Sequence, residues 1–148
     1  MAVNMYKKYA ENKTREWPVA SGTVAGQVVL HPISNQVGIT LTARGDATAT
    51  QTFIPAITGG TIKIGGVGNK PNTAVVAIDG SWILPVVGVT AGYTNAASGG
   101  GTASGTPVYM TAGGTYTLTS SGNTKIGVVD DGNILANTNT PVLLGANL

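Results

Sequence analysis

The stretch from Thr106 to Asp131 constrains the fold of this chain most, because it reads as three short strands joined by two tight turns. Gly113-Gly114 supplies the first turn, since glycine accepts the positive φ values that a two-residue hairpin needs. Residues 121–123 supply the second turn. Apolar and threonine residues alternate in the middle run, which is typical of a sheet with one packed and one wet face. The stretch predicts a meander with strands at residues 108–111, 116–119 and 125–129.

Short alternating runs bounded by turn residues continue through the rest of the chain from Pro18 onwards. Asp79-Gly80 is the strongest hairpin signal, and it predicts that the runs on either side of it pair with each other. Pro85 predicts a sheet edge or a bulge, because proline cannot donate to a ladder. The low-complexity run 91–106 predicts a flexible loop. The further expected strands are residues 24–31, 36–42, 48–54, 61–64, 72–78, 81–90 and 140–145.

A chain of 148 residues is typical of one domain with a real core. We therefore expect an all-β fold, a small β-barrel or β-sandwich of short antiparallel strands spanning residues 18–148 as a single domain. A weak internal similarity leaves open two similar β modules: the runs beginning at Val37 and Val87 each precede a Gly-Gly-Thr segment and a Gly-Asn turn.

Charged residues make up 9% of the chain, against about 25% in typical globular proteins. A surface with so little charge suits a chain packed against copies of itself or against a larger assembly. A neutral soluble β domain is the alternative.

Residues 1–17 form a segment of different composition, an N-terminal arm that holds four of the eight basic and two of the six acidic residues. The formal net charge of +2 therefore lies entirely in this arm. A helix is one interpretation; we favour an extended arm, because Trp17 precedes a proline and is held out of the helical region. The arm either docks on a neighbouring molecule or folds back on its own domain. The expected partner-binding residues are Met5, Tyr6, Lys7, Lys8, Tyr9, Lys13, Arg15 and Trp17.

Catalytic residues are not expected. A nucleophile needs a base, and the only histidine, His31, lies beside a proline in a predicted turn. The four acids outside the arm lie in turns, cysteine is absent, and the glycine-rich run before Pro71 lacks phosphate-loop spacing. We expect no enzyme activity, no cofactor and no metal site. We expect no membrane partner, because no apolar run reaches the length of a span, and no nucleic acid partner, because the basic residues are few and dispersed.

Four stretches with short glycine-containing motifs together cover roughly residues 18–145: GTVAGQVVLHPISNQVGIT, NTAVVAIDGSWILPVVG, GTPVYMTAGGTYTLTSSGNTKIGVVDD and TPVLLG. These stretches resemble the head decoration proteins of tailed phages, which are small β-rich capsid proteins. The first stretch lacks the acid and proline of related sequences at Ala25–Val28.

The resemblance implies a structural virion protein of a bacteriophage, located on the outer capsid surface. It further implies a homotrimer that binds the major capsid protein and stabilises the capsid against internal DNA pressure. The alternative function is a tail or surface β module that binds carbohydrate or a host receptor. That alternative predicts exposed aromatic residues gathered on one face, with Tyr93, Tyr109 and Tyr116 as candidates.

Overall fold

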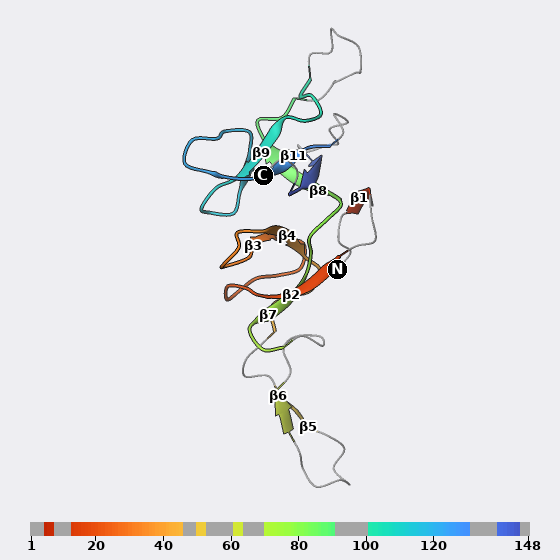
Figure 1. Ribbon diagram of the computed structural model, residues 1–148, viewed down its shortest axis with the longest axis vertical. Helices are drawn as coiled ribbons and strands as arrows, with labels where there is room; N and C mark the ends of the chain where they lie inside the picture. The colour runs from red at the N-terminus through yellow and green to blue at the C-terminus, as the bar shows by residue number, and fades with distance from the viewer. Residues whose placement is uncertain are drawn as a thin grey trace. The chain divides into compact units, whose positions relative to one another are not determined.

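A computed structural model of the chain describes residues 5–7, 13–45, 50–52, 61–63, 70–90, 101–130 and 139–145. All regular structure in these residues is β-strand, which confirms the expected all-β class (Figure 1). The chain divides into two compact units. Unit 1 comprises Thr14–Ala77, and unit 2 comprises Ala2–Lys13 together with Ile78–Leu148. The structure therefore groups residues 18–148, expected as one domain, into two units.

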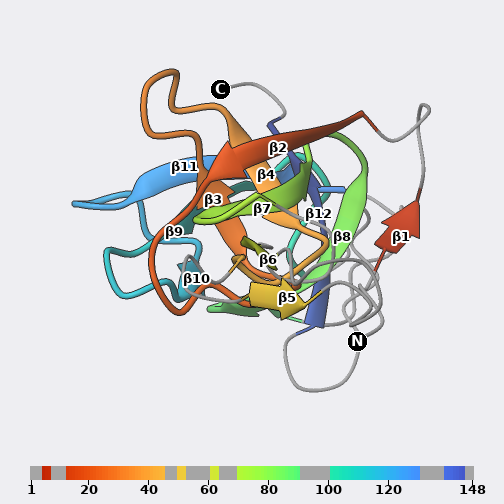
Figure 2. The same cartoon turned by 90° about the horizontal axis from the view of Figure 1, so that it is seen from below.

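Unit 1 is built on a four-stranded antiparallel sheet, seen from below in Figure 2. Its strand order is β2-β7-β4-β3, so β2 and β3 are the two edge strands. A separate two-stranded ladder, β5 with β6, lies in the same unit. The strands are β2 (Thr14–Pro18), β3 (Val28–Leu30), β4 (Val37–Thr40), β5 (Thr50–Thr52), β6 (Thr61–Lys63) and β7 (Thr73–Ala77).

Close packing in unit 1 centres on a glycine in β4. A β-carbon added at Gly38 would overlap a methyl group of Val76 and would lie 2.8 Å from the carbonyl oxygen of Ala77. It would also lie 3.2 Å from the ring of Trp17. Because no side chain occupies this position, β4 approaches β7 and the indole of β2 closely. The antiparallel pairing of β3 with β4 confirms the strand pair expected on either side of His31.

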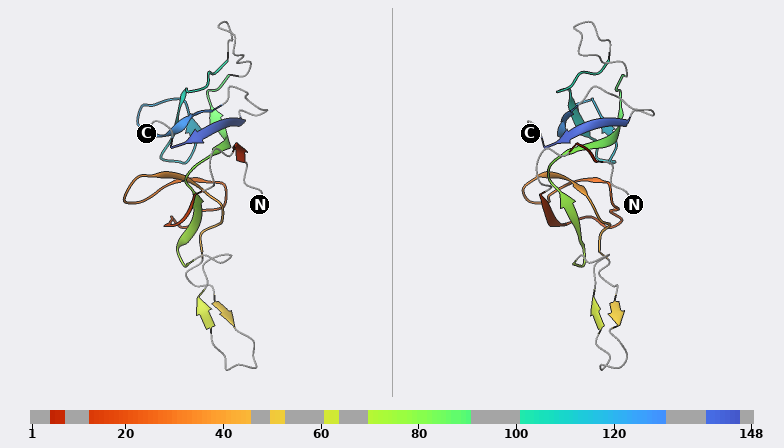
Figure 3. Two further views of the ribbon diagram at one scale, coloured as in Figure 1. Left: turned by 45° about the vertical axis from the view of Figure 1, so that its right-hand side comes forward. Right: turned by 90° about the vertical axis from the view of Figure 1, so that its right-hand side faces the viewer.

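Unit 2 contains a small closed barrel of five strands, in the order β8-β10-β9-β11-β12. Pairing of β12 with β8 closes the ring, and β8 and β12 run beside each other in both views of Figure 3. Strand β10 runs parallel to β8, and the other described pairs in the ring are antiparallel. The strands are β8 (Ser81–Val87), β9 (Pro107–Met110), β10 (Tyr116–Thr117), β11 (Thr124–Val129) and β12 (Asn139–Leu144). Strand β1 (Met5–Lys7) pairs with the start of β8.

The core of unit 2 follows from the alternation along β8. Trp82, Leu84 and Val86 are buried, whereas Pro85 and Val87 are exposed. The Trp82 indole N–H donates to the Asp79 carbonyl oxygen at 2.9 Å, so this side chain buries its polar atom without losing a hydrogen bond.

The sheet edge expected at Pro85 is wrong, because β8 pairs with β1 and β10 on one side and with β12 on the other. On one side of β8, β1 pairs only with residues 81–82 and β10 only with 86–87. The Leu144 N–H bonds the Gly80 carbonyl, so the ladder to β12 uses the even residues of β8. The missing N–H of Pro85 therefore points into the interval between β1 and β10.

Two expected pairings are wrong. The strands on either side of Asp79-Gly80 do not form a hairpin, since β7 pairs with β2 and β4 whereas β8 pairs with β1, β10 and β12. The expected meander has a different order, because β9 lies between β10 and β11. In the first case β7 and β8 pair with strands distant in sequence, and in the second β11 pairs with β9 while β8 takes the place beside β10.

Candidate functional site

The expected N-terminal arm does not exist as a separate segment over residues 14–17. These residues belong to β2, which pairs with β7 from Thr14↔Ala77 to Pro18↔Thr73. This is the alternative in which the segment folds back on its own domain. Hydrogen bonding to β7 explains it, since an extended strand that completes a sheet satisfies its backbone groups.

Trp17 is not available as a docking anchor, which corrects its place among the expected partner-binding residues. Its side chain is 3% exposed, and its ring packs edge-on against His31 with ring centroids 5.2 Å apart. The reason is the alternation of β2, which turns Trp17 into the unit while Glu16 and Pro18 on either side are exposed.

The other expected partner-binding residues fall in different places. Arg15 is exposed on β2, and Lys13 is exposed just before it. The Lys13 backbone N–H donates to both carboxylate oxygens of Asp79, at 3.2 and 3.3 Å, and its carbonyl accepts from the Ile78 N–H at 3.0 Å. Met5, Tyr6 and Lys7 form β1. Lys8 and Tyr9 lie outside the described residues.

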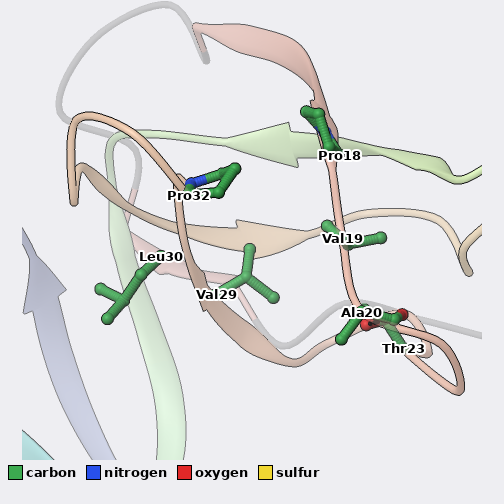
Figure 4. Close-up of a pocket in the computed structure, with 7 residues that line it drawn as sticks. All are labelled: Pro18, Val19, Ala20, Thr23, Val29, Leu30 and Pro32. Carbon is green, nitrogen blue, oxygen red and sulfur yellow. Dashed lines mark hydrogen bonds between the residues drawn. The ribbon is translucent and has the colours of Figure 1, made fainter.

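A groove of about 460 Å³ lies in unit 1 between the segment that follows β2 and the edge strand β3 (Figure 4). Its walls are apolar apart from Thr23, whose hydroxyl already donates to the Ala20 carbonyl oxygen at 2.7 Å. No charged side chain occurs between residues 18 and 43. The lining residues are Pro18, Val19, Ala20, Thr23, Val29, Leu30 and Pro32.

The turn from β3 to β4 is held in one conformation by His31. Its Nδ1 lies 3.1 Å from the Ser34 backbone N–H and 3.4 Å from that of Ile33, so Nδ1 is an acceptor for both. Asn35 adopts a φ of 55°, and its N–H donates to the His31 carbonyl at 2.9 Å. This rigid turn presents Ile33 with 88% of its side chain exposed. The expectation that His31 is a turn residue is confirmed.

Glu16 connects β2 to the turn before β7. Its Oε1 accepts from the Thr73 hydroxyl and from the Lys70 backbone N–H, each at 2.6 Å, and its Oε2 lies 3.9 Å from the Lys70 ammonium. The Thr73 hydrogen bond foremost, then the Lys70 N–H, holds the pKa of Glu16 below its ordinary value of 4.5.

Acid should therefore weaken unit 1 in part through Glu16. A carboxyl group whose pKa is lower in the folded state stabilises the fold above the unfolded pKa, and this contribution is lost as the pH falls through the folded pKa. We expect Glu16→Gln to lower the denaturant midpoint at about pH 7 and to differ less from the parent at about pH 3. Urea unfolding followed by Trp17 fluorescence, in a background carrying Trp82→Phe, measures both midpoints. Equal differences at the two pH values would contradict this role.

The aromatic residues expected for a carbohydrate-binding surface do not form a described cluster. Tyr116 is 9% exposed and belongs to the core of unit 2, and Tyr109 is half-buried. Tyr93 lies outside the described residues.

The described part of the chain contains no group of three or more His, Cys, Asp or Glu side chains arranged to hold a metal ion. It also contains no helix long and apolar enough to cross a membrane.

The groove was missed in the sequence. A signal was present in the long uncharged run after Glu16, which includes a Pro-Ile pair in a turn.

Comparison with known proteins found no match: no family model, no curated protein and no solved structure is similar to this chain.

Proposed function

We propose that this chain is a structural virion protein that decorates the outside of an icosahedral phage capsid by binding major capsid subunits as a homotrimer. The observation that supports it most is where the decoration-protein resemblance falls on the fold. Each of the four stretches supplies strands: β3 with β4, β7 with β8, β9 to β11, and β12. They therefore contribute to the sheets of both units.

The low charge of the chain supports the same proposal. A protein present in many copies on a shell binds with avidity, so each contact can be weak and need not involve strong ion pairs. Contacts around a three-fold axis are heterologous and closed. Among the expected partner-binding residues that the structure describes, Lys13 and Arg15 have exposed side chains and are available to contact a capsid subunit.

Co-sedimentation of the purified full chain with undecorated capsids tests the proposal. We expect saturable binding, and we expect decorated capsids to break at a higher temperature than undecorated ones. Absence of saturable binding over a range of salt and pH would overturn the proposal.

The double variant Lys13→Ala/Arg15→Ala tests the cationic contact separately. Loss of these two exposed positive charges should weaken capsid binding by about twofold to fivefold, and added salt should reduce this difference. The charge-conserving variant Lys13→Arg/Arg15→Lys is the control and should bind like the parent. Equal binding by all three proteins would move the contact elsewhere on the chain.

A further inference from the structure

The edge of β3 presents backbone hydrogen-bonding groups to the groove. The Thr40 N–H donates to the Gln27 carbonyl at 2.9 Å, and the His31 N–H donates to the Gln36 carbonyl at 2.8 Å. Bonded and non-bonded pairs alternate in an antiparallel ladder, so the pair Leu30↔Val37 is a non-bonded one. The N–H and C=O of Leu30 therefore point away from β4, and Leu30 lines the groove.

The opposite border of the groove carries both a proline and a charge on its edge strand, whereas the three residues of β3 carry neither. Pro18 ends β2 without an N–H, and Glu16 places a charge on the same edge strand. Proline and charge are the usual means by which edge strands avoid pairing with other chains. Leu30 lies in a strand of wholly apolar side chains, and Pro32, which has no N–H, limits the pairing edge to the main-chain groups of Leu30.

The chemistry of the walls indicates which kind of occupant fits. The volume of about 460 Å³ lies within the range of ligand pockets, but small-molecule sites carry convergent polar groups. Here the one polar lining side chain, Thr23, already donates its hydroxyl to Ala20. The polar groups offered are the main-chain N–H and C=O of Leu30, which are complementary to another main chain.

We propose that the groove binds an extended, uncharged polypeptide segment of a major capsid subunit, which pairs with the edge of β3 at Leu30 and places apolar side chains between Pro18 and Pro32. This deepens the proposed function and rests on it for the identity of the partner. The exposed Ile33, next to Pro32 on a rigid turn, adds an apolar contact at the end of the segment. Main-chain pairing supplies affinity in this mode, and the apolar walls select uncharged side chains.

Filling the groove tests the proposal without disturbing the core. Ala20 is exposed at the rim and lines the groove, so Ala20→Phe places a ring in it while leaving the backbone bond to Thr23 intact. Ser21→Phe adds the same ring to the next residue of the same turn, which does not line the groove, and is the matched control. We expect Ala20→Phe to weaken capsid co-sedimentation by about tenfold or more, Ile33→Ser to weaken it by about threefold or more, and Ser21→Phe to bind like the parent.

Amide hydrogen exchange adds a readout at the contact itself. The Leu30 amide should exchange rapidly in the free chain and slowly in the capsid complex. Parent-like capsid binding by Ala20→Phe, or unchanged exchange at Leu30, would overturn the groove proposal and leave decoration standing. Slow exchange at Leu30 in the free chain, lost on dilution, would show that a second copy occupies the edge and would overturn the proposed partner.

A separate experiment distinguishes failure of the groove proposal from failure of the decoration proposal. If the parent chain does not bind capsids, decoration fails, and a library of short random peptides is then selected on the parent chain and counter-selected on Ala20→Phe. Enrichment of uncharged peptides that slow exchange at Leu30 would support the groove as a strand-binding site. Failure to enrich any such peptide would overturn it.

Discussion

Replacing Trp17 with alanine should lower the free energy of unfolding of unit 1 by about 3–5 kcal/mol, the usual cost of removing a large aromatic side chain from a core. The indole is 3% exposed and packs against His31. Its ring also approaches the glycine position of β4, where a β-carbon at Gly38 would lie 3.2 Å away. The cavity left by the indole would persist, because the neighbouring strands β4 and β7 are paired with each other and cannot move into it.

Amide hydrogen exchange at the core residue Val76 measures this change within unit 1. The control is Arg15→Ala, an exposed substitution on the same strand, which should change stability by less than about 0.5 kcal/mol. Fluorescence of the remaining tryptophan, Trp82, reports on unit 2 in the same sample. If Trp17→Ala left exchange at Val76 unchanged and abolished capsid binding, the original interpretation of Trp17 as a docking anchor would be correct.

Replacing Gly127 with alanine should destabilise the barrel of unit 2 by about 3 kcal/mol, at the upper end of the usual cost of overpacking. A β-carbon there would overlap the carbonyl oxygen of Leu143. It would also lie 3.0 Å from the carbonyl carbon of Leu143 and 3.1 Å from the Cα of Leu144. These are backbone atoms of β12, which pairs with both β11 and β8, so the clash cannot be relieved by rotating a side chain.

Gly113→Ala is the matched control for this substitution. An added β-carbon at Gly113 would meet only the Thr111 hydroxyl oxygen, at 3.8 Å, and the backbone there does not require a positive φ. We expect a change of less than about 0.5 kcal/mol. Urea unfolding followed by Trp82 fluorescence, in a background carrying Trp17→Phe, compares the two variants. Equal midpoints would show that β11 and β12 do not approach closely at Gly127.

We place the main proposed capsid contact at the groove of unit 1, not on a free N-terminal arm, because residues 14–17 complete the sheet of unit 1. The charge and aromatic residues of the N-terminal segment suggested docking on a partner. Its backbone N–H and C=O groups are instead satisfied by hydrogen bonds when the segment completes its own sheet. Once β2 pairs with β7, Trp17 turns inward and only exposed side chains such as Arg15 remain at the surface. The uncharged groove lies between β3 and the segment that follows β2, and β2 and β3 are the two edge strands of the sheet.

The amino-acid sequence alone determined the class of fold and the position of many strands. The run 81–90 predicted a strand, and the strand at residues 81–87 confirms it because side-chain period is a local property. The edge position that Pro85 predicted is wrong, because strands distant in sequence pair with both sides of β8. The strand pair on either side of His31 was also predicted and is confirmed.

Only the tertiary structure decided which strands became neighbours. Asp79-Gly80 has the composition of a hairpin turn, and Gly80 has the positive φ of 93° that such a turn needs, yet β7 and β8 join different sheets. The division into two units and the groove beside β3 follow from such long-range pairings. Pairing depends on which distant edges can bury apolar side chains together, and that free energy is not encoded in any one turn.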